Sequence, residues 1–67
     1  MELDLSCWVV RRDRRYLVAI PEGLDIPRYS PHVYEAARIR NANDARAVAD
    51  AVGGNIHKFN PLTGEVV

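Results

Sequence analysis

The stretch Leu3–Ile20, with the sequence LDLSCWVVRRDRRYLVAI, decides the fold predicted for this chain. Apolar residues alternate on both sides of the polar Arg12-Asp13-Arg14 segment, a pattern typical of two β-strands joined by a turn. A turn of even length places two sets of side chains on opposite faces of such a hairpin. One set is Leu5, Cys7, Val9, Tyr16, Val18 and Ile20, and the other is Trp8, Val10, Leu17 and Ala19. Both faces of the predicted hairpin are therefore apolar.

The strongest helix signal covers residues 42–52. Asn41 is a favourable N-cap, and Asp44 at the third helical position lies near the positive end of the helix dipole. Gly53-Gly54 supplies the left-handed stop. A single apolar stripe at helical spacing is formed by Ala45, Val48, Ala49 and Val52. This helix is long enough to cover one face of a small sheet.

The segment between the hairpin and the helix is harder to assign. Pro21–His32 contains three prolines and Gly23, so we expect a loop without regular pairing, which packs Leu24, Ile26 and Tyr29 onto the sheet or serves another role. Val33–Ile39 is predicted as a strand, with a helix as the alternative because Ala36 and Ala37 are adjacent.

After the helix, the sequence predicts a second β-hairpin. Asn55–Asn60 is predicted as a strand, and Asn60–Gly64 has the proline and glycine of a turn. Glu65, Val66 and Val67 then form a short final strand. The expected fold is a single α+β domain, residues 1–67, with a small antiparallel or mixed sheet of three to five strands and one short helix on one face.

Composition and charge limit the functions to be considered. The chain has 67 residues, close to the lower limit for a fold stabilised by its hydrophobic core alone. Nine basic residues balance nine acidic ones, which disfavours global steering toward polyanions or anionic membranes. Cys7 is the only cysteine, and a chain without disulfides is typical of a reducing compartment, so we expect a cytoplasmic protein. No signal peptide or membrane span is expected.

The two apolar faces suggest a binding surface. One short helix shields one face, so if it covers the set with Cys7, then Trp8, Val10 and Leu17 need other cover. The functional interpretation is a protein–protein interface anchored by Trp8, with self-association into a homodimer as its simplest form. The structural interpretation is that the proline-rich loop folds back over Trp8. The opposite assignment of the two faces also stays open.

A second candidate site is the basic turn of the first hairpin. Arg11, Arg12, Arg14 and Arg15 could contact phosphates or enter a nucleic-acid groove, as two-stranded β-ribbons do. Such a cluster is more often a solvated turn that also protects edge strands from aggregation. Nucleic-acid binding is therefore the alternative function.

Catalytic and metal sites find little support in the sequence. Cys7 lies within an apolar strand, where a cysteine is usually a small core residue. His32 and His57 lie in other segments, and the three residues match none of the paired spacings of structural zinc sites. We expect no enzymatic activity, no cofactor, no metal and no small-molecule substrate.

The segment from Ala37 to Phe59, ARIRNANDARAVADAVGGNIHKF, combines a helix cap, an alanine stripe and a glycine stop between two strands. It resembles a strand-helix-strand module of short uncharacterised accessory proteins from phages and prophages of Gram-positive bacteria. The resemblance covers about a third of the chain and transfers no functional residue. It implies an accessory protein that works by binding, for example as an inhibitor of a host defence enzyme.

Overall fold

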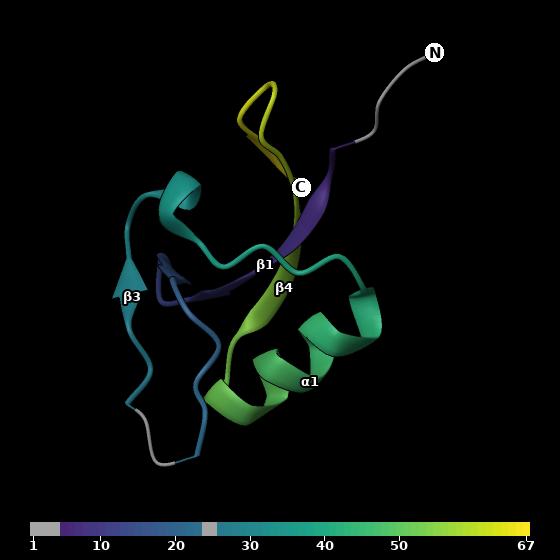
Figure 1. Cartoon of the computed structure of the whole chain (residues 1–67). Helices are drawn as coiled ribbons and strands as arrows, with labels where there is room; N and C mark the ends of the chain where they lie inside the picture. Colours follow the sequence, from purple (N-terminus) through teal and green to yellow (C-terminus); the bar gives the residue numbers. More distant parts are fainter. Residues whose placement is uncertain (1–4, 24–25) are drawn as a thin grey trace.

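The computed structural model of the chain describes residues 5–23 and 26–67. This part of the chain forms a five-stranded antiparallel sheet in the order β3-β2-β1-β4-β5 and one α-helix, α1 (Ala42–Val52) (Figure 1). The predicted α+β class, with a small antiparallel sheet and a single helix, is confirmed. The strands are β1 (Cys7–Arg12), β2 (Arg15–Leu17), β3 (Tyr29–Ser30), β4 (Asn55–Asn60) and β5 (Glu65–Val66).

The β1–β2 hairpin turns through the two residues Asp13 and Arg14. Their φ angles are 51° and 68°, and positive values at both positions match the twist of the flanking strands. Because the loop length is even, the predicted division of side chains holds along the paired strands. Trp8 packs with Val10 and Leu17 in one hydrophobic cluster, whereas Cys7, Val9 and Tyr16 belong to another. The hairpin is shorter than predicted, because β2 ends at Leu17.

Helix α1 has the predicted boundaries and the predicted caps. The side-chain oxygen of Asn41 accepts a hydrogen bond from the Asn43 N–H at 2.8 Å. At the other end Gly53 has a φ of 73°, and the Gly54 N–H donates to the Ala49 carbonyl at 2.8 Å. The stripe faces the sheet, with Ala45, Ala49 and Val52 buried. Its small side chains allow the helix to lie close to the strands.

The helix covers the face of the sheet that contains Val10 and Leu17. These two side chains are 1% and 0% exposed, and Trp8 is half-buried beside them. The hypothesis of an uncovered surface formed by Trp8, Val10 and Leu17 is therefore wrong. The opposite assignment of faces holds, because the buried side chains of α1 pack in one cluster with Val10 and Leu17.

The other face is covered by a short irregular segment. The 3₁₀-helix η1 (Val33–Glu35) is followed by Ala36, and both Val33 and Ala36 pack against a cluster that contains Cys7, Val9 and Phe59. Figure 1 shows the chain leaving η1, running to β1 and then entering α1, and Ile39 of this segment forms a bridge with Trp8 of β1. The two faces of one sheet thus have two different covers.

The predicted strand at Val33–Ile39 is wrong. The Ser30 hydroxyl accepts the His32 N–H at 3.2 Å and donates to the Glu35 carboxylate, which holds the chain after Pro31 in a turn. Only Ile39 forms a bridge, with Trp8 of β1.

The third strand lies earlier than predicted, within the proline-rich loop. Tyr29 and Ser30 pair with Leu17 and Tyr16. The flanking prolines, Pro27 and Pro31, are tolerated because β3 is an edge strand that pairs on one side only. Tyr29 packs against the helix-side cluster, as the fold-back interpretation expected, but Ile26 is 84% exposed. Leu24 lies outside the described residues.

The second hairpin follows the prediction. β4 occupies Asn55–Asn60, the chain turns through residues 61–64, and β5 returns beside it. Phe59 of β4 is fully buried and pairs with Val66. In Figure 1 the yellow turn of this hairpin lies at the end of β4 that is farther from α1.

Candidate functional site

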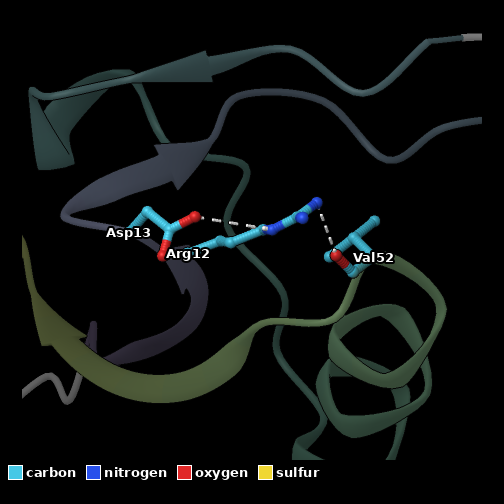
Figure 2. Close-up of polar contacts among 3 residues, drawn as sticks. All are labelled: Arg12, Asp13 and Val52. Atoms are coloured by element: carbon cyan, nitrogen blue, oxygen red, sulfur yellow. Dashed lines mark hydrogen bonds and ion pairs between the residues drawn. The ribbon is translucent and has the colours of Figure 1, made fainter.

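The predicted nucleic-acid cluster does not form one surface. The Arg11 guanidinium lies over the Tyr16 ring, 5.7 Å from its centroid. Arg12 Nη1 instead donates to the Val52 carbonyl at 3.1 Å, and Arg12 Nε lies 3.8 Å from an Asp13 carboxylate oxygen (Figure 2). Two of the four arginines therefore have structural contacts within the chain.

The two remaining arginines of the turn, Arg14 and Arg15, are exposed. Arg15 is paired directly with Arg12, and residues paired in this way project from the same face of a sheet. Arg11 lies on the opposite face with Tyr16. Although the four guanidinium groups are neighbours in sequence, the fold distributes them over two faces of the sheet.

A groove of about 590 Å³ lies away from this turn, at the beginning of β1. Its lining combines apolar side chains with two guanidinium groups and consists of Leu5, Ser6, Cys7, Arg38, Arg40 and Pro61. The groove therefore brings together the start of β1, the segment between η1 and α1, and the turn between β4 and β5.

The bridge to β1 positions the two arginines. The Trp8 N–H donates to the Ile39 carbonyl at 2.6 Å, and the Ile39 N–H donates to the Trp8 carbonyl at 2.9 Å. These bonds hold the chain extended, so residues on either side of Ile39 project to the face opposite its own side chain. The Ile39 side chain is buried in the helix-side cluster. Arg38 and Arg40 therefore project away from the helix and line the groove.

The Phe59 ring lies next to the groove and contacts Tyr34 and Arg38. The Tyr34 ring meets the Phe59 ring edge-on, with centroids 5.3 Å apart and an interplanar angle of 86°. The Arg38 guanidinium lies 5.8 Å from the centroid of the same ring, and the Tyr34 hydroxyl donates to the Pro61 carbonyl at 3.4 Å. Arg38 and Tyr34 thus flank one buried ring, and Tyr34 connects η1 to the β4–β5 turn.

Exposed apolar side chains belong to the groove or to residues directly connected to its lining. Leu5 is 49% exposed, Tyr34 57% and Leu62, which follows Pro61 in the turn, 68%. We call the whole region the Arg38 surface. It comprises Leu5, Tyr34, Arg38, Arg40, Pro61 and Leu62.

The charges of the Arg38 surface are unbalanced in the described part of the chain. Arg38 and Arg40 have no carboxylate within ion-pair distance among residues 5–23 and 26–67. Arg38 is instead held by its contact with Phe59. The groove therefore presents positive charge beside apolar side chains.

Cys7 lies at the groove but is poorly suited to act as a nucleophile. Its side chain is buried, and its sulfur lies 3.7 Å from the Phe59 carbonyl oxygen. Burial raises the pKa of the Cys7 thiol above its usual value of 9.0, and the Arg38 guanidinium opposes this shift. The thiol is therefore protonated at neutral pH, whereas the reactive form of a cysteine is the thiolate.

The described residues contain no group of histidine, cysteine and carboxylate side chains arranged to hold a metal ion. His32 lies at the start of η1, and His57 is half-buried within β4. Over the same residues, the structure has no helix with the length and apolar character needed to cross a membrane.

Sequence reasoning missed the Arg38 surface. The alternation Arg38-Ile39-Arg40 was available as a signal, because two arginines around one isoleucine fit an extended chain with one buried face. The contribution of Leu5, Pro61 and Leu62 left no such signal, since these residues meet only through tertiary structure. Comparison of this chain with protein-family models, with curated proteins and with solved structures finds no match.

Proposed function

We propose that this protein is a non-enzymatic binding module that docks onto another protein through the Arg38 surface. The observation that carries this proposal is the groove of about 590 Å³ whose lining joins Arg38 and Arg40 to the exposed Leu5 and the half-buried Pro61. Tyrosine and arginine are enriched at the energetic centres of protein interfaces.

The partner that we propose is a different protein and not a second copy of the chain. In a symmetric dimer the same patch meets itself. Contact through the Arg38 surface would bring Arg38 and Arg40 of both copies together, and like charges across an interface are unfavourable. We therefore expect a monomer by light scattering across a concentration series.

The setting that we propose is the one implied by the resemblance to phage and prophage accessory proteins. Such a protein works in the cytoplasm by binding a phage or host protein, and inhibition of a host defence enzyme is a special case. The alternative of nucleic-acid binding through the first hairpin has weaker support, because Arg11 and Arg12 contact Tyr16 and Val52 within the chain.

The proposal is tested by affinity capture from the native host with two matched double variants. Leu5→Ser with Leu62→Ser removes exposed apolar side chains from the Arg38 surface, whereas Ile20→Ser with Ile26→Ser removes similarly exposed ones elsewhere. We expect the first variant to lose the partner of the wild-type chain and the second to keep it. Circular dichroism should show the helix intact in both, since all four side chains are exposed.

Binding to the purified partner should then weaken by roughly tenfold or more in the Leu5→Ser, Leu62→Ser variant. Equal affinities of the two double variants for that partner would overturn the proposal. Loss of binding only in the Ile20→Ser, Ile26→Ser variant would place the interface on the loop before β3.

A further inference from the structure

We infer that the groove of the Arg38 surface receives an acidic side chain of the partner, which lies beside an apolar side chain of the same partner segment. This inference rests on the proposed function and specifies the chemistry of the bound segment. It concerns Arg38 and Arg40 in particular, because contacts of a partner with the exposed apolar residues alone would give these two arginines no role in binding.

The first reason is that, within residues 5–23 and 26–67, the two arginines of the groove have no carboxylate at ion-pair distance. Arg38 is already positioned, because its guanidinium lies over the Phe59 ring and its backbone is fixed by the bridge of Ile39 to Trp8. A guanidinium that is held in place loses less conformational entropy when it binds a carboxylate. Arg40 projects from the same side of the extended segment, so a second donor lies at the same groove.

The second reason is the apolar part of the lining. Leu5 and Pro61 share the groove with the two arginines, and Leu62 is exposed in the same turn as Pro61. A purely polar anion would leave these side chains in water. A peptide segment with an acidic residue next to a leucine-like residue satisfies both parts of the lining.

The same features favour a protein segment over a nucleic acid. Nucleic acids that bind along a surface are followed by a row of cations matched to successive phosphates. Here the described lining of the groove contains two cations, Arg38 and Arg40, and the chain as a whole has no net charge. The geometry therefore points to a local acidic group with an apolar neighbour.

The test uses two short synthetic peptides and a single-stranded oligonucleotide as probes. One peptide alternates glutamate with leucine, and its partner peptide has glutamine in place of each glutamate. Binding to the full ¹⁵N-labelled chain is followed through the Nε–H signals of the arginines and the amide signals of Cys7 and Leu62. We expect saturable shifts at Arg38 and Arg40 with the glutamate peptide. The glutamine peptide should bind at least about tenfold more weakly.

Two double variants with the same change of charge provide the control. Arg38→Gln with Arg40→Gln should abolish binding of the glutamate peptide, whereas Arg14→Gln with Arg15→Gln should leave binding unchanged. All four side chains are exposed, so both variants should fold like the wild-type chain. Raising the ionic strength should weaken binding to the wild-type chain. Equal binding of the two peptides, or equal losses in the two variants, would overturn the inference.

The remaining outcomes separate this inference from the proposed function. If the oligonucleotide competes for Arg38 and Arg40 more strongly than the glutamate peptide, the site is a nucleic-acid site and the inference fails. If the captured partner is lost with Leu5→Ser and Leu62→Ser but binds Arg38→Gln, Arg40→Gln normally, the proposed function stands and the acidic contact is wrong. If neither pair of substitutions weakens binding of that partner, the proposed function itself fails.

Discussion

The two faces of the central sheet are covered in different ways. On one face α1 places an alanine stripe directly over β1 and β4, and Val10 and Leu17 are almost completely buried. On the other face the cover is η1 with Ala36, a short irregular segment over Cys7, Val9 and Phe59. The first cover is regular and continuous, whereas the second is a single short turn that reaches the β4–β5 turn through Tyr34. The groove between Leu5, Arg38 and Pro61 remains beside it.

This difference shows where a small domain can place a binding site. A chain of 67 residues has little stability in reserve, so both faces must contribute to its core. On the helix face, the side chains of α1 pack against those of the strands. The η1 face combines a buried centre around Phe59 with an open edge, and that edge carries the Arg38 surface.

The largest expected effects come from removing the central side chain of each face. Phe59→Ala should cost about 3–5 kcal/mol and Leu17→Ala about 2–5 kcal/mol, because both side chains are fully buried. Losses of this size should leave either variant largely unfolded, as measured by urea denaturation followed by circular dichroism. A Phe59→Ala variant that loses less than about 1 kcal/mol would show that the η1 face is not part of the core.

The next effect tests how closely the chain after α1 approaches β1. A Cβ at Gly54 would lie 2.8 Å from the Arg11 carbonyl oxygen, whereas a Cβ at Gly53 meets open space and only the positive φ of 73° opposes it. We expect Gly54→Ala to cost about 2 kcal/mol or more and Gly53→Ala about 1 kcal/mol. The comparison uses thermal or urea unfolding. A larger loss for Gly53→Ala would contradict the close approach.

The stability of the η1 face should depend on pH through Cys7. Burial raises the pKa of Cys7 in the folded chain above 9.0, so folding favours the protonated thiol. The stability from this preference is complete below the unfolded pKa and is lost as the pH rises through the folded pKa. The wild-type chain should therefore lose more stability above pH 9.0 than Cys7→Ala does. Parallel profiles of unfolding free energy against pH would refute this expectation.

The smallest effect concerns the edge of the helix face. Arg12 donates to the last-turn carbonyl of Val52, at the negative end of the helix dipole. Arg12→Gln should cost roughly 0.5 kcal/mol because the group is largely solvated. The matched control Arg15→Gln, at the paired position in β2, should change stability less. Indistinguishable unfolding midpoints for the two variants would remove Arg12 as a helix cap.

Local signals in the sequence were sufficient for the helix and for both hairpins. Asn41 and Gly53 specify the ends of α1 through their own backbone and side-chain preferences, so no knowledge of the tertiary structure was needed. The alternation in β1 likewise grouped Trp8, Val10 and Leu17 correctly on one face. These are short-range properties of the chain.

The remaining features depend on long-range contacts. Alternation alone divides the side chains of β1 between two faces, but it does not select the face that α1 covers. Residues 33–35 were predicted as a strand because Val33 and Tyr34 favour one, yet the hydrogen bonds of Ser30 hold this segment in a turn. The groove unites Leu5, Arg38 and Pro61, which are far apart in sequence, so no local pattern identified it.

The most direct test of the account is to measure which face of the sheet the helix covers. In a nuclear Overhauser spectrum of the methyl-labelled chain, the methyl groups of Ala45 and Ala49 should contact those of Val10 and Leu17, and the Ala36 methyl should contact Val9 and Phe59. Contacts from Ala45 and Ala49 to Val9 and Phe59 would contradict the account. The Trp8 face would then be open, and the Arg38 surface would lose its basis.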